Sequence, residues 1–147
     1  MESHELLRYP YFAGLPQSAL QEIAWISSLR PFKAGDRLLE EGAKATHLIV
    51  IKSGRVDIIY RLGDKREVTA ESIVGGEAIG WSALLEPFKL TASVVGVRDG
   101  ELIAIEGGKL RELCEMDTWL GYQLMSEIAK GLRDRLNGLR VQLAATM

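Results

Sequence analysis

Cysteine and histidine are scarce in this chain of 147 residues, which holds one cysteine and two histidines. The lone thiol, Cys114, cannot form an internal disulfide or build a thiolate zinc cluster. His4 and His47 are too few for a multi-histidine metal site. We therefore expect no bound metal, and we interpret Cys114 as a buried structural thiol.

The chain also lacks a basic excess and a long hydrophobic run. Its 18 basic and 20 acidic side chains give a formal net charge of −2, so nucleic acid is not an expected partner. No signal segment or membrane span is evident, which predicts a cytoplasmic protein. No nucleophile and base stand in a catalytic pattern, and Glu40 and Glu41 lie in a predicted turn. We therefore do not expect an enzyme.

The length and composition fit one domain spanning residues 1–147. Its first part, residues 1–31, is expected to be helical, because Pro16 suits the first turn of a helix and Pro31 disfavours helix before it. Residues 32–106 have the pattern of short strands separated by glycine-containing turns. Residues 107–147 are expected to be helical again.

Three turns divide the predicted strands. Residues 52–55 end the β-branched run 48–51, and residues 62–65 end the run 56–60. Asp99 and Gly100 predict a hairpin at residues 98–101. Short strands at such regular spacing are typical of a sandwich or a barrel.

The last helix carries more apolar surface than one contact needs. Hydrophobic residues recur in steps of three and four, close to the helical period. They are Met125, Ile128, Leu132, Leu136, Leu139 and Leu143. A second stripe beside them includes Leu120, Leu124, Gly131 and Gly138. We predict that the first stripe forms a homodimer and that the second packs on the domain itself. The alternative is a helix that only covers its own domain.

Residues 35–56 show the opening pattern of a known family. Gly35 precedes a strand, Glu41 and Gly42 form a turn, an aliphatic strand follows, and Ser53 and Gly54 turn into the next strand. The pattern resembles that of the cyclic-nucleotide-binding domains with a catabolite-activator-like β-roll, over roughly residues 12–139. The resemblance implies a mainly β fold with flanking helices. Its parts are an eight-stranded antiparallel β-roll (double-stranded β-helix or jelly roll), an N-terminal helix, a short cassette helix and a long C-terminal helix.

The resemblance also implies a phosphate-binding cassette, a short helix inserted between two strands of the roll. Residues 76–77 match its start, residues 79–85 its helical turn and residues 91–92 its end. The implied ligand-binding residues are Gly75, Gly76, Glu77, Ala78, Ile79, Gly80, Leu90, Thr91 and Ala92. Glu77 is implied to accept a hydrogen bond from a ribose 2′-hydroxyl, and the amides of residues 78–80 to face the phosphate.

The cassette departs from the family pattern at Leu90. The family's phosphate-binding arginine aligns with this leucine, and residues 86–89 are an insertion. Because a buried anion needs a charged partner, we expect weak or altered binding of cAMP and cGMP, with another small anion as an alternative ligand. Lys89 is the candidate substitute cation. Since neighbouring strand residues face opposite sides, either Leu90 faces the pocket and Lys89 the solvent, or a bulge turns Lys89 inward.

Two further residues have alternative placements. Trp81 either stacks on a ligand or fills the pocket or the core. Arg135 reaches back to the pocket, pairs across a dimer, or lies at an interface with its charge in solvent.

Three functions are compatible with these observations. The first is a regulatory small-molecule-binding module for signal transduction, with no certain cofactor. The second is a degenerate β-roll that serves dimerisation or protein interaction. The third is a truncated or partial transcription regulator. The DNA-binding members of the family carry a helix-turn-helix domain after the long helix, and the sequence ends at Met147 without one, so DNA binding is not expected.

Overall fold

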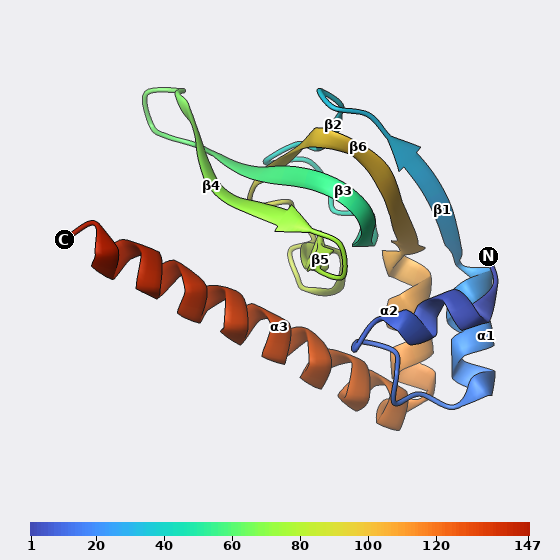
Figure 1. Ribbon diagram of the computed structural model, residues 1–147. Helices are drawn as coiled ribbons and strands as arrows, with labels where there is room; N and C mark the ends of the chain where they lie inside the picture. The colour runs from blue at the N-terminus through green and yellow to red at the C-terminus, as the bar shows by residue number, and fades with distance from the viewer.

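The computed structural model describes all 147 residues, and it consists of a curled antiparallel sheet with helices beneath it (Figure 1). Six strands form the sheet. This architecture confirms the predicted fold class of a mainly β-roll with flanking helices.

The N-terminal part is helical over a shorter stretch than predicted. A 3-10 helix, η1 (Ser3–Arg8), precedes α1 (Gln17–Trp25), which starts directly after Pro16. The boundary predicted at residue 31 is wrong, because strand β1 (Ser27–Phe32) follows and pairs with the later strand β6. Pro31 is tolerated there because β1 lies at an edge of the sheet, where a missing N–H donor costs no ladder hydrogen bond.

Two long strands run through the centre of the roll, β3 (His47–Arg61) and β6 (Ser93–Glu106). Neither the turn predicted at residues 52–55 nor the hairpin at residues 98–101 ends a strand. Instead, the register between β3 and β6 shifts at Ile51–Val56, which marks a bulge where both strands bend. Gly54 there has a φ of +86°, which glycine adopts without strain. The sheet has six strands and not the predicted eight, because β3 and β6 each continue through this bend as one strand.

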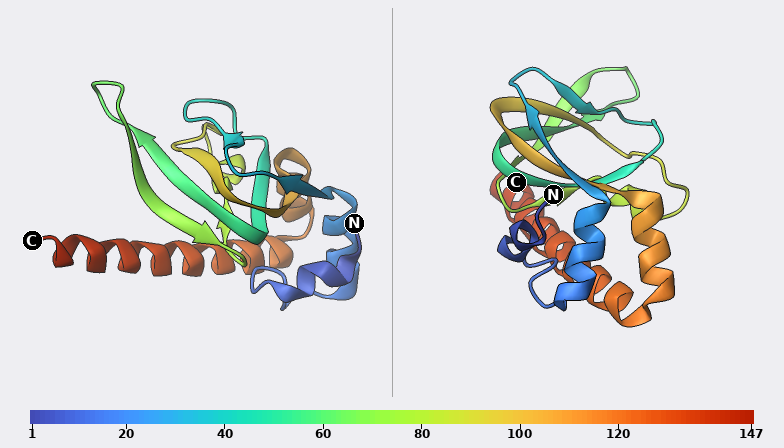
Figure 2. Two further views of the ribbon diagram at one scale, coloured as in Figure 1. Left: turned by 45° about the horizontal axis from the view of Figure 1, so that its top comes forward. Right: turned by 90° about the vertical axis from the view of Figure 1, so that its right-hand side faces the viewer.

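The shorter strands complete the roll. Strand β2 (Arg37–Leu39) pairs with β6, and β4 (Glu67–Val74) pairs with β3 through the turn predicted at residues 62–65. Strand β5 (Ala78–Ile79) pairs with the first half of β3. The hairpin of β3 and β4 stands over the C-terminal half of the last helix (Figure 2).

Two helices follow the roll, α2 (Gly107–Met116) and α3 (Thr118–Ala145). Asp117 caps α3, because its side chain accepts a hydrogen bond from the amide of Leu120 at 3.1 Å. The larger core lies between the helices and the part of the sheet formed by the start of β3 and the end of β6. The second core lies inside the roll. Figure 2 shows α1, α2 and the start of α3 side by side below the roll.

The last turns of α3 extend past the body of the domain (Figure 1). In the stripe predicted for a dimer, Leu136 and Leu143 are 49% and 64% exposed. Ile128 is a correction to that stripe, because it is buried in the domain's own core, and Leu132 packs beside that core. No helix of the chain has the length and apolar character needed to cross a membrane.

Candidate functional site

The cassette segment, residues 75–92, is attached to β3 by its backbone. The amide of Gly76 donates to the carbonyl of Ile51 at 2.7 Å, and the amide of Ile51 donates to the carbonyl of Glu77 at 2.9 Å. The chain then reverses at Gly80, whose φ is +72° and whose missing Cβ would lie 2.8 Å from the carbonyl oxygen of His47. Glycine is therefore required at this position by both conformation and space.

The helical part of the cassette is shorter than predicted. Residues 81–84 form a single 3-10 turn, η2 (Trp81–Leu84), and Ile79 belongs to β5 instead. Of the three amides that the resemblance assigns to a phosphate, that of Ala78 donates to the hydroxyl of Tyr11 at 3.1 Å. That backbone donor is thus occupied in this structure.

The insertion at residues 86–89 is fastened to α2 by Arg111. The Arg111 guanidinium lies 4.0 Å from the centre of the Phe88 ring, a cation–π distance. It also donates a hydrogen bond to the carbonyl of Ala83. The extra residues of the cassette are therefore held in place by a contact outside the roll.

Leu90 faces the inside of the cassette and Lys89 faces the solvent. Residues 88–90 run along residues 42–45, with hydrogen bonds of 2.8 Å from the amide of Leu90 to Ala43 and from the amide of Gly42 to Leu90. Strand alternation then sends the two side chains to opposite sides. Leu90 is 7% exposed against Ala45 and Ala83, whereas Lys89 is exposed.

The hollow beside Leu90, here called the cassette pocket, is small. Its volume is about 40 Å³, far below the range of about 300–1,000 Å³ typical of small-molecule sites. Gly80, Trp81, Thr91 and Ala92 are among its lining residues. Trp81 also packs against the larger core, which leaves little room for a ligand in this state.

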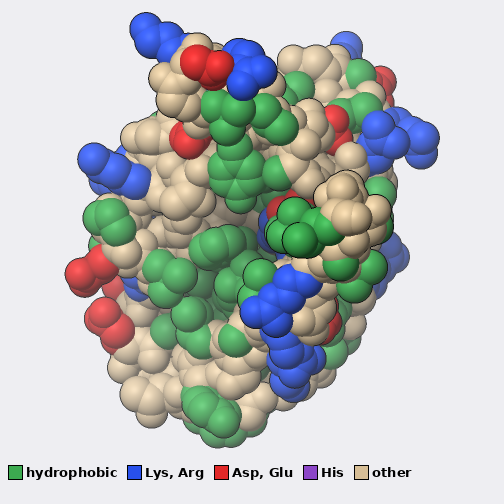
Figure 3. Space-filling view, turned by 90° about the vertical axis from the view of Figure 1, so that its left-hand side faces the viewer, with side chains coloured by type: hydrophobic (Ala, Val, Ile, Leu, Met, Phe, Trp, Pro, Cys, Tyr) green, Lys and Arg blue, Asp and Glu red, His purple; other side chains and the backbone are tan.

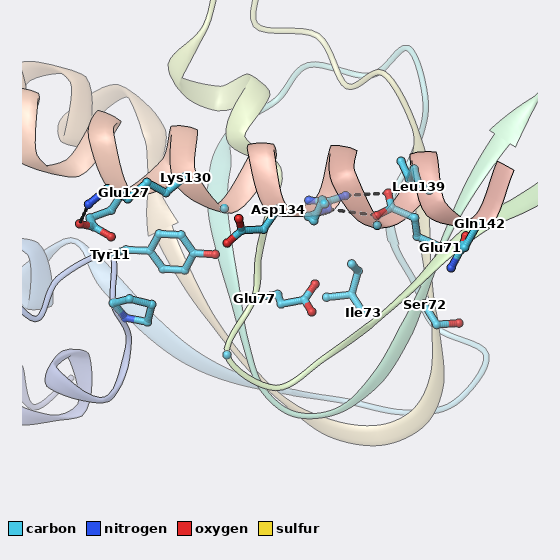
Figure 4. A pocket seen from close by; sticks show the side chains of 15 residues that line it. Tyr11, Glu71, Ser72, Ile73, Glu77, Glu127, Lys130, Asp134, Leu139 and Gln142 are labelled. Carbon is cyan, nitrogen blue, oxygen red and sulfur yellow. Dashed lines mark hydrogen bonds and ion pairs between the residues drawn. The ribbon is translucent and has the colours of Figure 1, made fainter. Parts of the chain in front are cut away.

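A larger hollow lies next to it, here called the mouth groove, between α3, strand β4 and the segment before α1. Its volume is about 490 Å³, within the range of about 300–1,000 Å³ typical of small-molecule sites. Its charged lining residues are Glu71, Glu77, Glu127, Lys130, Asp134 and Arg135. In Figure 4, Glu77 points into the groove between Tyr11 and Ile73. Viewed from the C-terminal end of α3, the molecule is hollowed, with hydrophobic side chains in the hollow (Figure 3).

Arg135 lines both hollows. Its Nε and Nη2 atoms donate to the two carboxylate oxygens of Glu71 at 3.2 and 2.9 Å, and its Nη1 donates to the carbonyl of Ala78 at 3.3 Å. The Glu71 contacts are dashed in Figure 4. Of the placements considered for Arg135, the structure has the one that reaches back to the pocket.

Glu77 has no side-chain hydrogen bond or ion pair in this structure, although it is half-buried. Burial raises the pKa of its carboxyl above the usual value of 4.5, Arg135 lowers it, and the negative charge of Glu71 raises it further. Glu77 therefore retains its capacity to accept hydrogen bonds from a ligand in the mouth groove.

The sequence did not single out Tyr11 or Glu71, which both lie at this site. Tyr11 comes from the segment before α1 and Glu71 from β4, and no local motif connects either to the cassette. Of the predicted cassette residues, Gly76 and Glu77 line the mouth groove, and Ile79, Gly80, Leu90, Thr91 and Ala92 line the cassette pocket, whereas Gly75 and Ala78 line neither. No cluster of metal-ligating side chains was found.

Comparison with known proteins gives one family match and three similar proteins. The family model described as "Cyclic nucleotide-binding domain" matches residues 29–117. Acetyltransferase Pat of Mycolicibacterium smegmatis is 36% identical over 93 residues, which is 62% of this chain and 27% of the relative, so the chain spans about a quarter of that protein. The crystal structure of a protein from Geobacter metallireducens GS-15, described as cyclic nucleotide-binding, is 31% identical with a TM-score of 0.84, covering 92% of this chain and 98% of that one. A cyclic nucleotide-binding domain from Methylobacillus flagellatus KT shares the fold, with 17% identity, a TM-score of 0.85, and coverage of 99% and 84%.

Proposed function

Because this chain belongs to the cyclic nucleotide-binding domain family, we propose that it is a regulatory ligand-binding module that binds ordinary cyclic nucleotides weakly. The observation that carries the proposal is the position of Leu90, whose aliphatic side chain lines the cassette pocket where the family's arginine is expected. An anion buried beside it has no charged partner at that point. The exposed position of Lys89 supports the same conclusion.

The charges around the mouth groove also disfavour an anion. Four carboxylates and two cationic side chains line it, and the two cations are already paired, Lys130 with Glu127 at 3.0 Å and Arg135 with Glu71 at 2.9 Å. A cyclic nucleotide must therefore displace an existing ion pair or accept a neighbouring negative charge. Either requirement lowers its affinity.

Thermal unfolding with millimolar cAMP, cGMP or a cyclic dinucleotide tests this proposal. A ligand present at 100 times its dissociation constant stabilises the folded state by about 2.7 kcal/mol. That gain raises the melting temperature by roughly 5–11 °C in a domain of this size. We expect a smaller shift for the natural sequence. A full shift with cAMP or cGMP would contradict weak binding.

Leu90→Arg restores the missing cation and is expected to strengthen cAMP binding by about tenfold or more, the effect of a charge-assisted hydrogen bond. Leu90→Gln is the matched control, because it changes the polarity and the fit at the same position without adding charge. A folded Leu90→Arg protein that binds cAMP no better than Leu90→Gln would contradict a nucleotide-binding cassette with Leu90 at the position of the family's arginine.

A second candidate function is a non-binding module that serves dimerisation or protein interaction. The cassette pocket of about 40 Å³ and the exposed apolar residues of α3 favour it. The same experiment separates the two, because a non-binding module gives no shift with any nucleotide in the natural sequence or in Leu90→Arg.

A further inference from the structure

Arg135 forms the wall between the mouth groove and the cassette pocket. It is among the lining residues of both hollows, and also of the small gap between α3 and Trp81. Its side chain comes from α3 but lies against β4 and the cassette. A movement of this one side chain would therefore join the two hollows.

The guanidinium of Arg135 has N–H donors that are not used in hydrogen bonds within the protein. It has five N–H groups, and three of its nitrogens make the contacts with Glu71 and Ala78, one hydrogen bond to each acceptor atom. The two-point contact with Glu71 is the geometry that a guanidinium also uses for phosphate. Arg135 and Glu71 are only 18% and 12% exposed, so the carboxylate holds this cation away from water at the edge of the cassette.

We propose that Arg135 supplies from α3 the phosphate-binding cation that the cassette lacks at Leu90, and that Glu71 occupies it in the ligand-free protein. This inference rests on the proposed function. The phosphate of the ligand takes the place of the Glu71 carboxylate on Arg135, and the body of the ligand lies in the mouth groove beside Glu77. Ligand affinity is weak because the phosphate must compete with a carboxylate that is already in position.

The alternative is that the pair only fastens α3 to β4. The two hypotheses predict different effects of these substitutions on ligand binding. A fastening pair predicts that Glu71→Gln and Arg135→Gln both lower the melting temperature and that neither changes ligand binding. A ligand site predicts the same loss of stability but opposite effects on binding, because one variant frees the cation and the other removes it.

Isothermal titration calorimetry with cAMP measures this difference. Glu71→Gln is expected to bind cAMP about tenfold or more tightly than the natural sequence. The double variant Glu71→Gln/Arg135→Gln is expected to lose that gain. Adenosine, which has the same base and ribose but no phosphate, is expected to bind all of these proteins equally.

Glu127→Gln is the matched control for charge. Glu127 lines the same groove but pairs with Lys130, so its substitution removes one negative charge without freeing Arg135. An equal gain in Glu127→Gln and Glu71→Gln would overturn the proposal, because it would show only a general electrostatic effect. The proposal is also wrong if the double variant keeps the gain.

Leu90→Arg separates failure of this inference from failure of the proposed function. If Leu90→Arg binds cAMP and Glu71→Gln does not, the site exists but Arg135 is not its phosphate-binding residue. If neither variant binds cAMP, both the ligand-binding function and the role of Arg135 are wrong.

Discussion

The hydroxyl of Tyr11 accepts a hydrogen bond from the backbone amide of Ala78 at 3.1 Å. This contact connects the segment before α1 with the first residue of β5, 67 positions later. The Tyr11 ring also lies against α3, since a Cβ on Gly131 would be 3.3 Å from the same hydroxyl oxygen. One side chain therefore joins the N-terminal segment, the cassette and α3.

Replacing Tyr11 with Phe removes only the hydroxyl and leaves the amide of Ala78 without this partner. The free energy of unfolding is expected to fall by about 1 kcal/mol, the usual net value of such a hydrogen bond. Urea denaturation measures the change. Tyr122→Phe is the control, because Tyr122 is 70% exposed and makes no hydrogen bond through its side chain in this structure. Equal stability of the Tyr11 and Tyr122 variants would contradict the prediction.

Glu77 is expected to make stability depend on pH. Burial raises the pKa of its carboxyl in the folded state above 4.5, so the folded state holds the proton more tightly than the unfolded state does. The free energy of unfolding therefore falls as the pH rises from 4.5 through the folded pKa, and the loss is complete above it. Glu77→Gln removes this loss.

The melting temperature of Glu77→Gln is thus expected to exceed that of the natural sequence near pH 7. The difference should shrink as the pH is lowered toward 4. Scanning calorimetry across this range measures it, with Glu112→Gln at an exposed position of α2 as the control for removal of one charge. A difference that grows as the pH falls would contradict the assigned sign.

Gly100 is expected to be the glycine least tolerant of a side chain. A Cβ there would be 2.7 Å from the Cα of Gly54 and closer still to the carbonyl oxygen of Ser53. Because only backbone atoms block it, neighbouring side chains cannot move aside. Gly100→Ala should lose at least about 3 kcal/mol of unfolding free energy, at the upper end for overpacking.

Gly63→Ala is the control for that substitution. Gly63 lies between β3 and β4, and a Cβ there would meet no atom within 4 Å. Its stability is expected to change by less than about 1 kcal/mol. Similar urea midpoints for the two variants would show that the two strands can separate at the bend.

The close approach of Gly100 to Ser53 and Gly54 explains why the sequence predicted the architecture but misplaced two turns. Asp99 and Gly100 form a good hairpin signal, yet β6 continues through them because Gly100 allows β3 to cross close by. A glycine that ends a strand and a glycine that lets another backbone approach look alike in the sequence. The turn at residues 62–65 was predicted correctly, and β3 and β4 pair directly on either side of it.

The site was predictable only where it follows the chain locally. Residues 76–92 lie close in sequence, so their pattern resembled the cassette, but it left open whether Leu90 or Lys89 faces inward, and the structure has Leu90 inside. Tyr11, Glu71 and Arg135 meet through contacts of 57 to 67 positions, and their placement depends on the angle at which α3 crosses the roll. Neither hydrophobic periodicity nor a short motif predicts that angle.

The exposed stripe on α3 leads to a prediction about assembly. An isolated helical segment gains little stability in water, and α3 extends beyond the body of the domain with Leu136 and Leu143 largely exposed. A second copy of the same helix would cover them, as the sequence predicts for a homodimer. Leu136→Glu places a charge in that interface and is expected to give a monomer, measured by sedimentation velocity.

Val141→Glu is the matched control, because Val141 is 70% exposed and lies on a different side of α3 from Leu136 and Leu143, given about 100° per residue. We expect it to remain a dimer. If the natural sequence sediments as a monomer at all concentrations, the homodimer is wrong and the stripe serves another contact. If both substitutions dissociate the dimer, the interface is not confined to the stripe. A charge on either side of α3 would then disturb it.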